Sequence, residues 1–173
     1  MTNKTDLRFV KTERLIEETY LKLKKEASAS VKVSELCAKA LINKSTFYSH
    51  YETMEALDEY VCAKEVGGML AHCPNIDDAF ADTPAFVESL VKMIKENLPL
   101  IEILFKKDTI RQLSVFESCL LQRYLHGNES PQMEMKIIFA IGGAARLLIT
   151  NQDKERIRMT IQLIKLIFDS GES

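Results

Sequence analysis

The sequence predicts an all-α protein of about nine helices, in which a three-helix N-terminal unit stands on a helical bundle body. Apolar residues recur at spacings of three and four along nearly all of its 173 residues, which is the period of helices with one buried face. With only 6 Gly and 4 Pro, the chain favours long regular elements over many turns. Its hydrophobic fraction of 46% and its charged fraction of 28% are ordinary for a globular protein.

The first predicted helix spans residues 6–27 and carries an apolar stripe. The stripe consists of Phe9, Leu15, Ile16, Tyr20, Leu23 and Ala27. Basic residues load the start of this helix, namely Lys4, Arg8, Lys11 and Arg14. Positive charge there opposes the helix dipole, so phosphate contact explains it better than local stability does. A solvated charged face is the alternative interpretation.

Residues 33–57 predict two short helices joined by a tight turn, followed by the start of a longer helix. The short helices span about 33–40 and 44–50. Phe47 and Tyr51 lie four residues apart, so they would bury one face of the second short helix.

Capping residues and prolines divide the rest of the chain into helices. The fourth helix begins near Thr53, a suitable N-cap, and runs to about Val66, where Gly67-Gly68 would weaken or end it. Pro99 breaks a later helix. Four further helix starts carry a capping side chain, at Thr83-Pro84, Asp108, Ser130-Pro131 and Asp153.

The second short helix has a polar face without a carboxylate. The residues on this face are Lys44, Ser45, Thr46, Tyr48, Ser49 and His50. The second helix of a helix-turn-helix needs such a face, because it enters a groove lined with phosphates. A surface helical hairpin is the alternative interpretation, since such patterns are common.

Charge is distributed unevenly along the chain. The formal net charge of the whole chain is −2. Residues 1–51 hold ten basic and six acidic residues, a net charge of +4, whereas residues 52–173 carry a net charge of −6. The basic part coincides with the predicted helix-turn-helix, which favours nucleic-acid binding over chance scatter.

Several classes of protein and site are not indicated. No apolar run approaches the roughly 20 residues of a membrane-spanning helix, and the start lacks the apolar core of a secretory signal, so we expect a cytoplasmic protein that does not bind membranes. The four cysteines are expected to be reduced thiols within the core. His72-Cys73 supplies too few ligands for a metal site. No catalytic or cofactor motif is present, so we expect neither an enzyme nor a bound cofactor.

The last two predicted helices are apolar over more than one face. A helix that is hydrophobic on two sides needs two partners, and the second could be another copy of the chain in a four-helix interface. Burial within a single core is the alternative. The residues expected at the dimer interface are Ile137, Ile141, Ala144, Ala145, Leu148, Ile157, Ile161, Ile164 and Phe168.

The body helices also contain candidate liners of a ligand pocket. These are Met69, Phe80, Phe86, Met93, Phe105, Phe116 and Tyr124. Side chains of these types at helical spacing more often form simple core.

The stretch from Ala40 to Tyr51 resembles the helix-turn-helix core of TetR-family transcriptional regulators, of the type found in low-GC Gram-positive bacteria. The first helix resembles the same family, so the motif-level likeness covers about residues 6–60. The resemblance implies a DNA-binding domain at 1–51 and a ligand-binding and dimerisation domain at 52–173. The residues then expected at DNA are Lys32, Ser34, Lys44, Ser45, Thr46, Tyr48, Ser49 and His50.

Three positions depart from the family pattern. Leu41 stands where a glycine is usual, and a side chain there would strain a left-handed turn residue, so we expect a looser turn. Lys32 replaces a capping threonine but could itself reach a phosphate. Met54 replaces a common lysine and removes one phosphate contact.

The function implied by the resemblance is transcriptional regulation. Such a protein would act as a repressor that binds palindromic operator DNA as a homodimer through residues 44–50. An unknown small molecule in the C-terminal body would release or modulate it. The alternative is a co-regulator of the same fold that acts mainly through a protein partner and binds DNA weakly.

Overall fold

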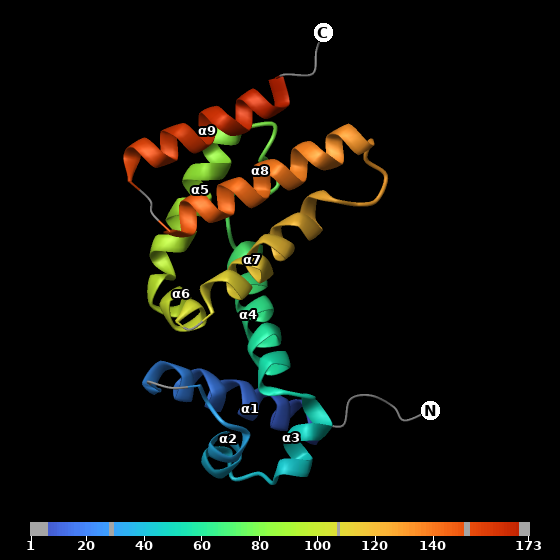
Figure 1. Cartoon of the computed structure of the whole chain (residues 1–173), viewed down its shortest axis with the longest axis vertical. Helices are drawn as coiled ribbons and strands as arrows, with labels where there is room; N and C mark the ends of the chain where they lie inside the picture. Colours follow the sequence, from blue (N-terminus) through green and yellow to red (C-terminus); the bar gives the residue numbers. More distant parts are fainter. Residues whose placement is uncertain (1–6, 28–29, 107, 151–152, 170–173) are drawn as a thin grey trace.

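The computed structural model describes residues 7–27, 30–106, 108–150 and 153–169. These residues form nine α-helices and no strand, which confirms the all-α prediction (Figure 1). The helices are α1 (Leu7–Glu26), α2 (Val33–Ala40), α3 (Lys44–His50), α4 (Met54–Ala71), α5 (Thr83–Glu96), α6 (Leu98–Phe105), α7 (Thr109–Tyr124), α8 (Pro131–Thr150) and α9 (Lys154–Asp169). Lys4 lies outside the described residues.

Helices α1 to α3 form a small head, and α4 runs from this head into the body (Figure 1). In the body α4 packs on α7, α7 on α8 and α8 on α9, while α5 closes against α9. α1 contacts α6, so the head also rests on the body away from α4. No helix in the described ranges is long and apolar enough to span a membrane.

Side-chain caps set most of the helix starts. Thr53 accepts the amide N–H of Ala56 at 3.0 Å and begins α4 as predicted. Asp108 and Asp153 accept amides in the first turns of α7 and α9 at 3.1 and 2.8 Å. At α5 the predicted cap was wrong by one residue. Asp82 caps that helix, whereas the hydroxyl of Thr83 donates to the Ala79 carbonyl.

Helix α4 does not end at Gly67-Gly68, as the sequence suggested, but continues to Ala71. A glycine in a helix interior costs about 1 kcal/mol relative to alanine. The next two residues, Met69 and Leu70, are buried in the core, and burying one such side chain contributes about 1.5–3 kcal/mol. Tertiary packing therefore outweighs the local preference.

The turn between α2 and α3 keeps a left-handed residue although that residue is leucine. Leu41 has φ 56° and ψ 40°, and its N–H donates to the Cys37 carbonyl. The amide of Ile42 donates to the same oxygen at 3.0 Å. The expectation of a looser turn was therefore wrong, because these two hydrogen bonds hold it tight. The leucine side chain is 92% exposed, so it contributes little to the core.

Replacing Leu41 with glycine is expected to raise the free energy of unfolding by about 0.5–1 kcal/mol. The left-handed conformation costs a residue with a side chain about 1–2 kcal/mol, and glycine offsets part of this gain by its freer unfolded chain. Leu41→Ala is the matched control, because it removes the exposed side chain but keeps the strain. If urea denaturation gave the glycine variant a free energy of unfolding no higher than that of the alanine variant, Leu41 would not be strained.

The core of the head is built from one face of each helix. Ile16 and Tyr20 from α1 pack with Leu36 from α2 and Phe47 from α3, all buried. The predicted α1 stripe is too wide at its N-terminal end. Phe9 and Leu15 are about half exposed.

The inner face of α8 and α9 contains most of the residues expected at the dimer interface. Six of them are buried in the protomer's own core, namely Ile137, Ile141, Ala144, Ala145, Leu148 and Ile164. The other three are partly buried and pack on the same core, namely Ile157, Ile161 and Phe168. The exposed apolar side chains of α8 and α9 are different ones, among them Phe139 and Leu166.

The seven candidate pocket liners lie in different parts of the described body. Met69 and Met93 line a shared cavity. The rings of Phe80 and Phe86 each pack on Tyr124, with centroids 5.1 Å and 6.3 Å from that ring. Phe86, Phe105 and Phe116 are buried core residues.

The four cysteines are free thiols. Burial raises the pKa of Cys62 to about 12, so at pH 8 only a minute fraction of this thiol is the reactive thiolate. We expect iodoacetamide to modify Cys62 roughly 100-fold or more slowly in the folded protein than in urea. Peptide-resolved mass spectrometry would show this. Labelling of Cys62 at the rate of the half-buried Cys119 would contradict it.

Candidate nucleic-acid interface

Helix α3 is fixed to the head by one anchor and one polar network. The anchor is Phe47, whose side chain is 0% exposed. At the end of α3 the hydroxyl of Tyr51 donates to Glu17 Oε1 at 3.2 Å, and Lys64 Nζ donates to Glu17 Oε2 at 2.6 Å. The network joins α1, α3 and α4. Burial, followed by the nearby Glu17 charge, raises the pKa of Tyr51, so its hydroxyl stays protonated.

The outward face of α3 presents most of the residues predicted at DNA. On α3, Lys44, Ser45 and Ser49 are exposed and Tyr48 is 54% exposed, whereas Lys32 and Ser34 are exposed at the start of α2. Thr46 is half-buried. Phe47 points inward between these residues, so anchor and outward face lie on opposite sides of one short helix.

His50 differs from the other predicted contacts because it packs against α1. Its ring stacks on Phe9 with centroids 3.9 Å apart. Its Nδ1 atom is buried and meets no hydrogen-bond partner among the described residues. The imidazole is therefore partly a packing residue at the end of α3.

Asn43 is a residue of this site that the sequence analysis did not single out. It is the N-cap of α3, and its Oδ1 accepts the amide N–H of Thr46 at 2.9 Å. The same oxygen accepts the hydroxyls of Ser45 and Thr46 at 2.8 and 2.7 Å. The signal was present, since an asparagine directly before a short helix is a preferred N-cap.

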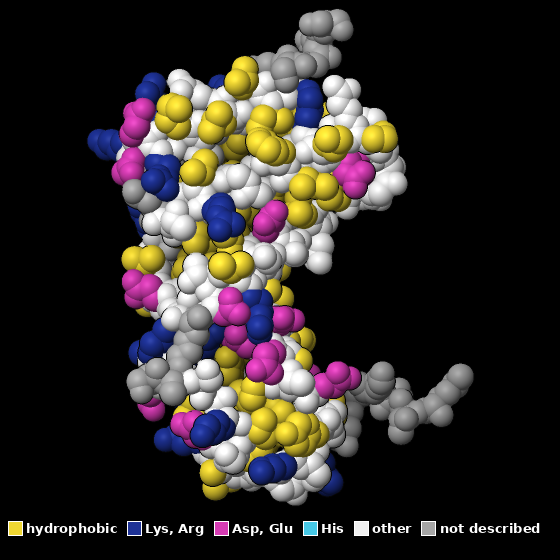
Figure 2. All heavy atoms as spheres, in the orientation of Figure 1, with side chains coloured by type: hydrophobic (Ala, Val, Ile, Leu, Met, Phe, Trp, Pro, Cys, Tyr) yellow, Lys and Arg dark blue, Asp and Glu magenta, His cyan; other side chains and the backbone are white. Residues whose placement is uncertain are grey.

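The charge around α3 suits a polyanion. α3 itself contains Lys44 and no carboxylate, and Lys32 and Lys39 on and beside α2 are exposed. Glu35 is an exposed acid on α2. Dark blue basic side chains lie around the lower part of the head in Figure 2.

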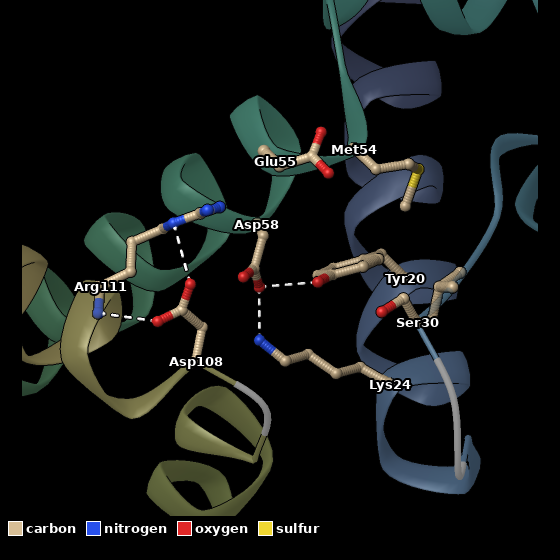
Figure 3. Close-up of a pocket in the computed structure, with 9 residues that line it drawn as sticks. Tyr20, Lys24, Ser30, Met54, Glu55, Asp58, Asp108 and Arg111 are labelled. Atoms are coloured by element: carbon tan, nitrogen blue, oxygen red, sulfur yellow. Dashed lines mark hydrogen bonds and ion pairs between the residues drawn. The ribbon is translucent and has the colours of Figure 1, made fainter.

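A charged cluster lies where the head meets the body. Figure 3 shows Asp58 of α4 between Tyr20 and Lys24 of α1. Asp58 Oδ1 accepts the Tyr20 hydroxyl at 2.6 Å and pairs with Lys24 Nζ, while Oδ2 accepts Gln112 Nε2 at 2.6 Å. Lys24 also donates to the Leu104 carbonyl at 2.8 Å. One carboxylate thus connects α1, α4 and α7.

The same junction contains a small polar cavity of about 250 Å³. It is lined by Tyr20, Lys24, Ser30, Val31, Met54, Glu55, Asp58, Asp108 and Arg111. Met54, at the position where the family resemblance implies a lysine, faces this cavity. Across the described residues, no group of three or more His, Cys, Asp or Glu side chains could hold a metal ion.

Comparison with known proteins gives fold-level similarities only. No family model matches the chain and no curated protein matches it. Among solved structures, the dihydroxyacetone kinase operon activator DhaS is 14% identical, with 93% of this chain and 96% of that chain covered and a TM-score of 0.47. A TetR-family transcriptional regulator from Streptomyces coelicolor is 14% identical, with 90% and 80% covered and a TM-score of 0.46. Similarity this distant does not carry a function to this chain.

Proposed function

We propose that the protein is a TetR-like transcriptional regulator that represses by binding palindromic operator DNA as a homodimer. Helix α3 enters the major groove of each half-site, and a small molecule bound in the body modulates the binding. The protein then acts in the cytoplasm, on the DNA. The observation that carries this proposal is the outward face of α3, which is exposed, free of carboxylates and rigidly anchored by Phe47. A recognition helix needs these three properties together.

The proposed homodimer uses the outward face of α8 and α9. Large apolar side chains are exposed there, and yellow side chains gather over these helices in Figure 2. Phe139 is 74% exposed, and it lines an apolar hollow of about 260 Å³ together with Gly143, Leu163 and Leu166. An exposed apolar face of this kind marks an interface. Two such faces would form a symmetric four-helix contact.

The proposed small-molecule site is a cavity of about 520 Å³ between α4, α5 and α6. Its size falls in the range of ligand pockets. Met69 and Met93 supply apolar walls, while Glu65, His72 and Ser89 supply polar groups. A ligand here would touch α4, the helix that continues into the head, and so could change the spacing of the two heads.

Tyr48→Ala is expected to weaken binding to duplex DNA about tenfold, since it removes one exposed contact whose loss would cost about 1–2 kcal/mol. The exposed ring supports little of the head core, so dimer formation should be unchanged and the loss of stability should stay below about 1 kcal/mol. Fluorescence anisotropy with a labelled duplex, alongside light scattering, measures both. Leu98→Ala, on the exposed surface of the body, is the matched control. Unchanged DNA binding by a folded Tyr48→Ala variant would contradict the proposed contact.

A further inference from the structure

Three hydroxyl groups of α3 donate hydrogen bonds to acceptors within the protein. Ser45 Oγ and Thr46 Oγ1 donate to Asn43 Oδ1 at 2.8 and 2.7 Å. Ser49 Oγ donates to the backbone carbonyl of Thr46 at 2.7 Å. These are the hydroxyls that the proposed function brings to the DNA, so the direction of their hydrogen bonds decides what they can contact.

The direction of each bond is fixed by its acceptor. The amide N–H of Thr46 donates to the same Asn43 atom at 2.9 Å, so that atom must be the carbonyl oxygen of the side chain and not its nitrogen. A carbonyl oxygen cannot donate a proton to a hydroxyl. The same holds for the backbone carbonyl that receives Ser49. While these internal bonds are kept, each hydroxyl offers a ligand its lone pairs and not its proton.

Duplex DNA offers few donors to such acceptors. Phosphate oxygens only accept, so these hydroxyls cannot bind the backbone without breaking their internal bonds. In the major groove the donors are the exocyclic amino groups, N6 of adenine and N4 of cytosine, whereas guanine N7 and O6 and thymine O4 are acceptors. An acceptor-only hydroxyl in that groove therefore matches adenine or cytosine.

We infer, on the basis of the proposed function, that Ser45, Thr46 and Ser49 read the amino groups of adenine or cytosine. Asn43 is the positioning residue that gives the Ser45 and Thr46 hydroxyls their acceptor character at the N-terminal end of α3, whereas the backbone carbonyl of Thr46 does the same for Ser49. Ser45 and Ser49 are four residues apart and share one face, about 6 Å apart along the axis. That is roughly two base-pair steps at 3.4 Å each. The operator half-site then carries amino-bearing bases at the positions that face these residues.

The test uses the operator selected by the wild-type protein from a random duplex pool. Each adenine of the half-site is replaced in turn by deoxynebularine, which lacks the 6-amino group, and each cytosine by a 2-pyrimidinone nucleoside, which lacks the 4-amino group. Removing a contacted amino group should weaken wild-type binding about fivefold to tenfold. When the amino group that Thr46 reads is removed, the Thr46→Val variant should bind the natural and the modified duplex equally. The Ser45→Ala variant should do the same for the amino group that Ser45 reads.

Two further variants separate this role from a structural one. Thr46→Ser keeps the oxygen and should restore the discrimination that Thr46→Val abolishes. Lys44→Ala should weaken binding to the natural and modified duplexes by the same factor and leave the discrimination intact. Thermal unfolding of each variant shows whether its head is folded. If Thr46→Val fails to fold, the Thr46→Ser variant still tests whether the oxygen at this position discriminates between the duplexes.

The outcomes distinguish this inference from the proposed function. An enriched operator that tolerates removal of every amino group, or that places only guanine and thymine edges opposite α3, would overturn the inference and leave the regulator intact. A pool in which no sequence is enriched would overturn both.

Discussion

Replacing Asp58 with alanine is expected to lower the free energy of unfolding by about 3–5 kcal/mol. The reason is the environment of Lys24, which is only 4% exposed and faces Asp58 across the junction between head and body. Without the carboxylate, a buried ammonium group loses its counter-charge. Tyr20 and Gln112 lose their acceptor at the same time. Urea denaturation followed by circular dichroism measures the loss.

The matched control breaks an ion pair on the surface. Arg14 and Glu18 form a pair at 3.3 Å on α1, with both side chains more than half exposed. Glu18→Ala should change stability by less than about 0.5 kcal/mol, since exposed pairs contribute little. If the two alanine variants lost similar amounts, the junction cluster would not be holding the head on the body.

Phe47→Ala is expected to cost about 3–5 kcal/mol, the usual loss for a fully buried aromatic residue. The side chain packs between α1 and α2 and gives α3 its orientation, so DNA binding should be lost together with the head. Denaturant unfolding and an amide exchange measurement on residues of α1 to α3 would report the change.

The neighbouring residue provides the control for this prediction. Tyr48 lies next to Phe47, with ring centroids 5.3 Å apart, but it is 54% exposed. Tyr48→Ala should therefore cost less than about 1 kcal/mol. Equal losses in the two variants would mean that α3 is rotated relative to the arrangement described here.

Local signals in the sequence were sufficient for most helix boundaries. Thr53 and Asp108 are caps whose hydrogen bonds lie within three residues, so the sequence pattern contains the whole interaction. The predicted end of α4 at Gly67-Gly68 was wrong, because burial of Met69 and Leu70 in the core stabilises the helix beyond the two glycines. That contribution is not local, and the periodicity of one segment does not show it.

In the candidate site, too, local contacts were predicted from the sequence and contacts between distant residues were not. The outward face of α3 followed from the spacing of Phe47 and Tyr51. The pairing of Lys24 with Asp58 spans 34 residues and was not visible in any local pattern.

The apolar faces of α8 and α9 show a second limit of what periodicity predicts. Helices α8 and α9 each have apolar residues on two faces, and periodicity alone does not tell which face the protomer covers. The inner set, such as Ile141 and Leu148, was chosen from the sequence, whereas Phe139 and Leu166 are the exposed ones.

Operator binding by a dimer is tested most directly by selecting bound sequences from a random duplex pool with the purified protein at moderate salt. A dimeric operator-binding protein should enrich a near-palindrome, with half-sites about one helical turn or more apart. Its affinity should fall steeply as salt rises, because phosphate contacts release counterions. A folded dimer that enriches no sequence would contradict the account, and it would favour a co-regulator that acts through a protein partner.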